Sequence, residues 1–159
     1  MTKTSKQSID KQLSFALYTS FRFSNRLFNE VLSDYKLTYT TFLILQVLWQ
    51  REEAGQTSTF IYEIQDALFL DTGTVSPVIN KLVKKDLIKK VTDATDQRKK
   101  HIELTQQGRD LKAPVLERIN QLQEKLEVED EQEIVEHLKY IQKKYESILI
   151  NSKLNNVIL

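Results

Sequence analysis

The stretch LDTGTVSPVINKLVKKDLIKK, residues 70–90, decides the fold of this chain. A helix opened by Asp71 or Thr72, whose short polar side chains favour helix N-termini, places four aliphatic residues on one inward arc: Val75, Val78, Ile79 and Leu82. The opposite face carries hydroxyls, an amide, a proline and lysines but no acid: Ser76, Pro77, Asn80, Lys81 and Lys84, with Thr74 at its edge. The stretch therefore predicts an amphipathic helix with a basic outer face.

Pro77 constrains where this helix begins. A proline lacks the backbone N–H, and that loss is harmless only in the first turn, where the N–H has no helical partner. We therefore expect the helix to start close to Pro77.

The segment that follows this helix predicts a β-hairpin. After Asp86 the hydrophobic period changes, and the apolar residues of 87–88 and 102–104 indicate two short strands. The polar sequence TDATDQRKK, residues 92–100, joins them. We call this hairpin the wing.

Helical patterns lie on both sides of the basic helix and the wing. Apolar residues at three-to-four spacing predict a long helix from residue 9, a buried helix capped by Thr38 with the body FLILQVLW (42–49), and a short helix over 61–68. After the wing, Thr105 caps a fifth helix, inside which Pro114 can introduce a bend, and Asp130 opens a last one.

This order indicates a mainly α protein, an α+β winged helix-turn-helix with six helices and a two-stranded wing. We expect a flexible N-terminal tail over residues 1–8 and a winged helix-turn-helix DNA-binding domain over 38–104. Residues 9–37 and 105–159 then form a helical dimerisation region, because so long an apolar stripe lacks enough partners within one small protomer.

Charge is distributed unevenly although the net charge is only +1. Residues 81–101 contain eight lysines and arginines against three aspartates, whereas residues 124–136 contain seven acidic residues against one lysine. This asymmetry favours a polyanion-facing segment and a separate face that is not, although both runs are also compatible with solvated helix surface.

The basic helix and the wing have the chemistry of a DNA reader. Hydroxyl and amide side chains can bond base edges, Pro77 can contact a thymine methyl, and lysines can pair with phosphate or guanine. Arg98 at the wing tip can enter the minor groove, and Asp96 can hold its guanidinium in place.

Several stretches resemble the MarR family of bacterial transcription regulators, and most closely its organic-hydroperoxide and oxidative-stress sensors. They are LSFALY (13–18), LTYTTFLILQVLW (37–49), LFLDTGTVSPVINKL (68–82), DLIKK (86–90) and DATDQRKKHIELTQQG (93–108). The resemblance implies an intertwined homodimer on a pseudo-palindromic double-stranded DNA operator, usually as a repressor. The expected DNA contacts are Thr38, Tyr39, Thr72, Thr74, Ser76, Pro77, Asn80, Lys81, Lys84, Asp96, Arg98 and Lys99.

Two departures from that family stand out. Ser14 occupies the position where the peroxide sensors usually carry a cysteine, and the chain contains no cysteine at all. Serine cannot form a sulfenic acid, so a cysteine redox switch is excluded. The second departure is an insertion within EEAGQTST, residues 52–59, before the third helix.

The remaining trigger that the resemblance implies is a small aromatic or phenolic ligand between the dimerisation helices and the winged domain. The candidate pocket residues are Ser14, Phe15, Tyr18, Phe28 and Phe42, and each is also compatible with a plain structural role in the core. Such a ligand would release DNA by favouring a dimer whose recognition helices are mis-spaced.

Other function classes fit less well. The chain has two histidines and no phosphate-binding loop, dinucleotide-binding or zinc-protease motif, which argues against an enzyme, and we expect no cofactor and no metal. A metal-responsive regulator using His137 with Glu133, and a winged helix that binds only proteins, remain alternatives. The polar N-terminus and the short apolar runs favour a cytoplasmic protein without a membrane partner.

Overall fold

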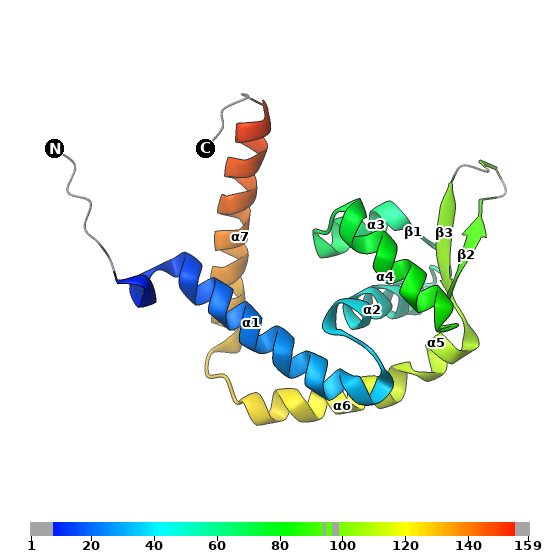
Figure 1. The fold of residues 1–159 in the computed structure, drawn as a ribbon, viewed down its shortest axis with the longest axis horizontal. Helices are drawn as coiled ribbons and strands as arrows, with labels where there is room; N and C mark the ends of the chain where they lie inside the picture. The colour runs from blue at the N-terminus through cyan, green and yellow to red at the C-terminus, as the bar shows by residue number, and fades with distance from the viewer. Residues whose placement is uncertain (1–7, 94, 97–98, 155–159) are drawn as a thin grey trace. The chain divides into compact units, whose positions relative to one another are not determined.

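The computed structural model describes residues 8–93, 95–96 and 99–154 (Figure 1). Contacts divide the chain into two units, Met1–Leu122 and Gln123–Leu159, which are described separately. The described helices are α1 (Leu13–Leu32), α2 (Tyr39–Glu53), α3 (Ile61–Leu68), α4 (Thr72–Lys84), α5 (Gln106–Asp110), α6 (Lys112–Leu126) and α7 (Glu131–Leu154). The described strands are β1 (Thr59–Phe60), β2 (Ile88–Thr92) and β3 (Lys100–Leu104).

The predicted order of elements is confirmed, with two refinements. The fifth expected helix is divided at Leu111 into α5 and α6, because Pro114 has no N–H to donate to the carbonyl of Asp110. Counted together, these two give the six expected helices. The strand β1 was not expected, and it makes the sheet three-stranded.

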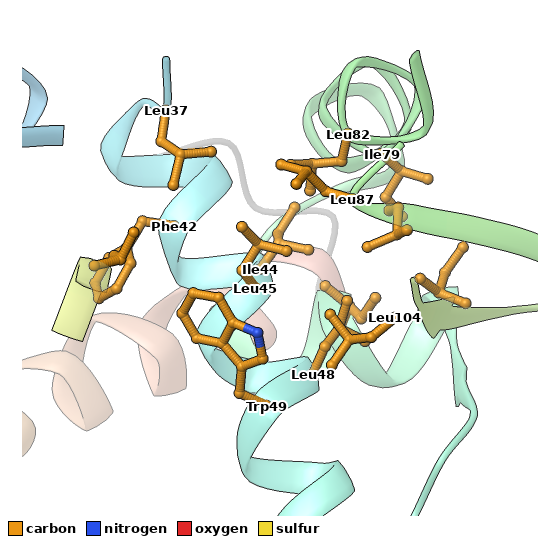
Figure 2. Close-up of a cluster of buried hydrophobic side chains, with 14 of the residues drawn as sticks. Leu37, Phe42, Ile44, Leu45, Leu48, Trp49, Ile79, Leu82, Leu87 and Leu104 are labelled. Atoms are coloured by element: carbon orange, nitrogen blue, oxygen red, sulfur yellow. The ribbon is translucent and has the colours of Figure 1, made fainter. Parts of the chain in front are cut away.

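Helix α2 forms the centre of the core. Its N-terminus has a reciprocal cap, in which the Thr38 backbone N–H donates to Thr41 Oγ1 at 2.7 Å and the Thr41 N–H donates to Thr38 Oγ1 at 3.3 Å. Figure 2 shows Ile44, Leu45 and Leu48 of α2 on the side of aliphatic residues of α4 and β3, with Phe42 on the opposite side of the helix. The buried members on α2 are Phe42, Ile44, Leu45, Leu48 and Trp49.

Helix α4 packs on this core through the predicted aliphatic stripe. Val75, Ile79 and Leu82 are fully buried, and Val78 is half-buried. The expected position of Pro77 is wrong: Asp71 Oδ1 accepts the Thr74 N–H at 2.7 Å and starts the helix at Thr72, so Pro77 lies in the second turn.

The sheet has the order β1-β3-β2, and both pairings are antiparallel. In the central strand β3, Ile102 is fully buried and lies opposite Thr59 of β1 and Lys90 of β2. The other end of the hairpin is closed by a bond from the Asp93 N–H to the Lys99 carbonyl at 2.9 Å. The wing is therefore attached to the core at its base through β3.

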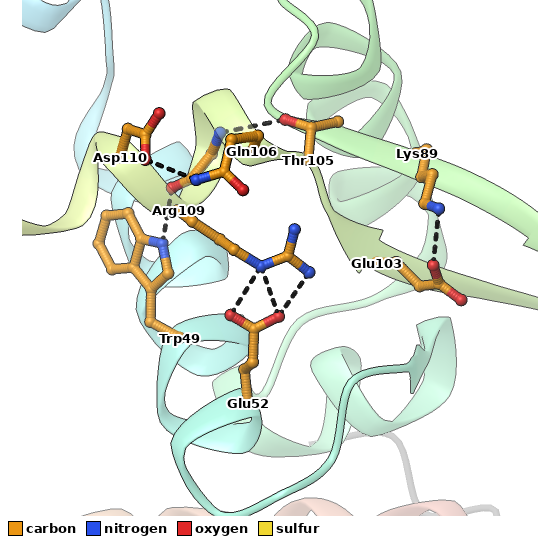
Figure 3. A network of polar contacts seen from close by, with 9 residues as sticks. Trp49, Glu52, Lys89, Glu103, Thr105, Gln106, Arg109 and Asp110 are labelled. Carbon is orange, nitrogen blue, oxygen red and sulfur yellow. Dashed lines mark hydrogen bonds and ion pairs between the residues drawn. The ribbon is translucent and has the colours of Figure 1, made fainter.

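Glu103 of β3 has one polar partner on β2 and one on its own strand. Lys89 Nζ lies 2.9 Å from Glu103 Oε2, and His101 Nε2 lies 3.3 Å from Glu103 Oε1 (Figure 3 shows the Lys89 contact). The hydrogen bond from Lys89 is the largest cause that holds the pKa of Glu103 below its ordinary value of 4.5. This cross-strand pairing stabilises the hairpin register.

Helix α5 packs against α2 and against the segment that leads into β2 (Figure 3). Trp49 Nε1 donates to the Gly108 carbonyl at 2.9 Å, and Arg109 makes a forked pair with Glu52 at 2.7–3.1 Å. The Thr105 N–H donates to the Leu87 carbonyl at 3.1 Å, and the Thr105 hydroxyl caps the helix by accepting the Gly108 N–H at 3.0 Å. These contacts fix the segment that leads from the wing into α6.

Large apolar side chains remain exposed in both units. In the first unit, several lie on α1 and on the short 3₁₀ turn before it, and others lie on or beside α3 and on α4: Ile9, Leu13, Tyr18, Phe21 and Phe23, and then Tyr62, Phe69 and Val83. In the second unit they follow α7: Ile134, Val135, Leu138, Tyr145 and Ile148. Among the described residues, no helix combines the length and apolar character that a membrane span needs.

Replacing Gly108 with alanine is expected to destabilise the protein. A Cβ at this position would lie 2.0 Å from the backbone carbonyl oxygen of Leu87, so α5 and β2 would have to move apart. Such overpacking costs about 1–3 kcal/mol. Urea unfolding of Gly108→Ala should show this loss, while Gln107→Ala, an exposed change on the same helix, should have little effect. Equal stability of the two variants would contradict the close approach.

Glu103→Gln is expected to destabilise the protein at neutral pH by less than about 1 kcal/mol, because the pair with Lys89 is partly exposed. The folded state lowers the pKa of Glu103, so this stabilisation is present above pH 4.5 and is lost as the pH falls through the lowered pKa. Urea unfolding should therefore separate the variant from the unmodified protein at pH 7 but not at strongly acidic pH. A difference that stays constant with pH, or an equal effect of the exposed change Glu129→Gln, would argue against the ion pair.

Candidate nucleic-acid interface

The outer face of α4 presents the predicted polar and basic residues to solvent. Thr72, Thr74, Pro77, Asn80, Lys81 and Lys84 are exposed, and Ser76 is half-buried. Burial of the opposite stripe fixes the rotation of the helix about its axis, so these side chains are held outward together. The structure thus brings together the seven expected contact residues of this helix.

The N-terminal turn of α4 is tied to α3. Gln65 Nε2 donates to Thr72 Oγ1 at 2.8 Å, which leaves the Thr72 hydroxyl hydrogen available for another acceptor. The link to Gln65 was not predicted, because seven residues and a helix break separate the two positions.

Asn80 contacts the wing. Lys90 Nζ, from the middle of β2, donates to Asn80 Oδ1 at 2.6 Å, and both side chains are exposed. Lys90 was absent from the expected contact residues, since no local pattern pairs a helix residue with a residue of the following strand. The bond joins the two elements that a winged helix uses on DNA.

The lysines at the end of α4 have different surroundings. Lys81 and Lys84 are exposed, whereas Lys85 is half-buried and donates to the backbone carbonyl of Lys36. Burial is the largest cause that lowers the pKa of Lys85, followed by the positive charges of Lys81 and Lys36. The bond from Lys85 therefore stabilises the end of α4. Lys81 and Lys84 stay exposed and can bind an external anion.

The described part of the wing tip is organised by Asp93. Its Oδ1 accepts the backbone N–H groups of Thr95 at 2.8 Å and Asp96 at 3.0 Å. The Thr95 hydroxyl also donates to Oδ1, and this bond is the largest cause that lowers the pKa of Asp93. The carbonyl of Asp96 accepts the Lys99 N–H at 2.9 Å, and the Lys99 side chain is exposed. Arg98 lies outside the described residues, so its contact with Asp96 stays a prediction.

Thr38 and Tyr39, the remaining expected DNA contacts, have structural roles in this chain. The Thr38 hydroxyl caps α2, and Tyr39 is half-buried with its ring centroid 4.6 Å from that of Phe28. The Tyr39 N–H donates to Asn29 Oδ1 at 2.7 Å, and burial raises the pKa of its phenol. Contact of either residue with DNA stays a prediction.

The expected ligand-pocket residues have different surroundings in the described chain, and a ligand site among them stays a prediction. Phe28 and Phe42 both flank Tyr39 in a row of rings that ends at Trp49, and Phe42 is buried. Ser14 and Tyr18 are exposed on α1, and Phe15 is half-buried there. A shallow hollow of about 300 Å³ on α1 includes only Tyr18 of the five; its other lining residues are Thr19, Arg22, Phe23 and Arg26.

His137 and Glu133, the alternative metal pair, are both exposed on α7. Within the part of the chain that the structure describes, no three histidine or acidic side chains are grouped so that they could hold a metal ion.

Sequence comparison relates the chain to helix-turn-helix regulators. A family model described as "Transcriptional regulator SarA/Rot" matches residues 26–115, more than half of the chain. The chain is 37% identical over 106 residues to the HTH-type transcriptional regulator TtmR of Methylorubrum extorquens, covering 67% of this chain and 52% of TtmR. It is 34% identical over 109 residues to SarZ of Staphylococcus aureus, covering 69% of this chain and 70% of SarZ.

Structural comparison finds the same fold in solved structures. The structure of reduced AbfR bound to DNA superposes with a TM-score of 0.72 at 23% identity, covering 86% of this chain and 93% of AbfR. A mutant of MarR from E. coli superposes with a TM-score of 0.60 at 24% identity, covering 84% and 96% of the two chains. The predictions of a winged helix-turn-helix fold and of a transcriptional regulator are confirmed. The chain belongs to the SarA/Rot family of transcriptional regulators, a non-enzymatic class.

Proposed function

We propose that this regulator binds a pseudo-palindromic double-stranded DNA operator as a homodimer, with the outer face of α4 in the major groove and the wing over the adjacent minor groove. The observation that carries the proposal is the acid-free outer face of α4, where Lys81 and Lys84 are exposed beside hydroxyl and amide groups. Such a face matches the phosphate oxygens and base edges of the major groove.

A DNA partner accounts for this surface better than a protein-only winged helix does. A protein-binding face has no need to exclude acidic residues while it displays lysines, whereas a polyanion requires both. AbfR is solved bound to DNA, and so is MepR of S. aureus, which superposes with a TM-score of 0.70. These neighbours support DNA binding by the same fold in this chain.

A regulator that acts on a bacterial operator belongs in the cytoplasm.

The dimer would use the helical segments outside the winged domain, residues 9–37 and 105–159. The apolar residues exposed on α1 and on α7 favour burial against a second copy of the chain. A two-fold dimer would place its recognition helices roughly 34–36 Å apart, one turn of DNA, and would therefore prefer a pseudo-palindrome.

Repression released by a small aromatic or phenolic ligand is the regulatory mode that fits this proposal. A dimer seated on a promoter blocks polymerase, and a ligand that prefers a mis-spaced dimer would lower the DNA affinity by its differential binding. AbfR is solved in reduced and overoxidised forms. This chain has no cysteine and cannot follow a thiol-based route.

Lys84→Ala is expected to weaken DNA binding at every sequence and to lower the slope of log affinity against log salt concentration by about one. The physical reason is the loss of one phosphate contact and of the counterion that it releases. Gel-shift titrations over a range of salt concentrations, with the protein's own upstream region as probe, provide the measurement.

The matched control for this change is Lys125→Ala, which removes an exposed lysine from α6 instead. It should leave both affinity and salt slope unchanged, and sedimentation should give one oligomeric state for all three proteins. Binding that is insensitive to salt in the unmodified protein would contradict the proposal. An equal effect of the two lysine changes would contradict the role of α4.

A further inference from the structure

The hydrogen bond between Lys90 and Asn80 restricts the hydrogen bonds that Asn80 can make to DNA bases. Lys90 comes from the middle of β2, its neighbour Lys89 pairs with Glu103, and its own ammonium lies 2.6 Å from Asn80 Oδ1. A lysine ammonium has three donors and no acceptor, so only the oxygen of the amide can face it. The amide nitrogen of Asn80 is therefore turned away from Lys90, with its two N–H groups available.

This arrangement weakens the acceptor half of the chemistry with which an asparagine recognises adenine. Bidentate recognition of adenine in the major groove needs the amide oxygen to accept from N6 and the amide nitrogen to donate to N7. One lone pair of Oδ1 is taken by Lys90, and the ammonium held beside the oxygen disfavours the approach of a second donor such as adenine N6, while the remaining N–H groups of Lys90 add further donors. No acidic side chain lies on the outer face of α4 to supply an acceptor in its place.

We propose that Lys90 is a positioning residue that turns the amide nitrogen of Asn80 toward DNA and holds a cation beside its oxygen, so that the pair binds hydrogen-bond acceptors of DNA and disfavours adenine. Two sources supply this chemistry: the O6 and N7 atoms of a guanine edge, and the phosphate oxygens of the backbone. The inference rests on the proposed function and adds base preference to it.

Binding selection from a randomised duplex library tests the proposal, because the library presents every base at each position of a half-site. The proteins to compare are the unmodified chain, Asn80→Ala, Lys90→Met and the matched control Lys89→Met. Lys89 precedes Lys90 on the same strand, is also exposed and contacts Glu103 rather than Asn80. Circular dichroism and sedimentation establish that the four proteins are equally folded and assembled.

If the pair reads guanine, the unmodified chain selects guanine at one position of each half-site, and Asn80→Ala loses that preference. Lys90→Met then removes the cation beside the amide oxygen and shifts the same position toward adenine by about tenfold, while Lys89→Met leaves it unchanged. If the pair binds phosphate, all proteins select one sequence, both Asn80→Ala and Lys90→Met lower the affinity for it, and Lys90→Met reduces the salt slope by about one.

Two results would overturn the proposal. One is an adenine preference of the unmodified chain that depends on Asn80; the other is a Lys90→Met protein that matches Lys89→Met in base preference, affinity and salt slope. Failure of the proposed function gives a different result, because the unmodified chain would then enrich no duplex and show no salt-sensitive binding.

Discussion

The packing of α4 against α2 is the interaction on which the DNA-facing surface depends. Val75, Ile79 and Leu82 are fully buried, and exposing one such side chain would cost about 1.5–3 kcal/mol. Their burial leaves α4 a single rotation about its axis, and that rotation turns its hydroxyl, amide and lysine side chains outward as a set. The Asp71 cap fixes the residue at which the helix begins, so each of those side chains also has a defined position along the helix axis.

The contacts of α5 with α2 and with Leu87 fix the position of the segment that follows the wing. Trp49 and Glu52 of α2 hold Gly108 and Arg109, and the Leu87 carbonyl approaches so closely that only glycine fits at position 108. The same helix α2 therefore supports α4 on one side and the exit from the wing on another. In the dimer that we propose, α5 would connect a change in α6 with the recognition helix α4.

The parts of the fold that the sequence predicted are those set by local chemistry. The caps at Thr38, Asp71 and Thr105 and the aliphatic stripe of α4 follow from residues a few positions apart. The position of Pro77 was wrong because the cap outweighed the preference of proline for a first turn. Distant pairings had no local signal: the two-residue strand β1, the pair of Glu52 with Arg109, and the bond of Lys90 to Asn80. The ring contacts that place Phe28 and Phe42 around Tyr39 likewise depend on how α1 meets α2.

The central claim is that the outer face of α4 lies on DNA, and the absence of native cysteine allows a direct measurement of it. An iron chelate that generates hydroxyl radicals can be attached at Val83→Cys on α4, where the side chain is 36% exposed, or at Glu117→Cys on α6 as a control. On a duplex enriched from a randomised library, the α4 probe should cut the DNA at two places about one helical turn apart, and the α6 probe should not cut. Equal binding by both labelled proteins, with no cutting from α4 or with cutting from α6 alone, would contradict the account.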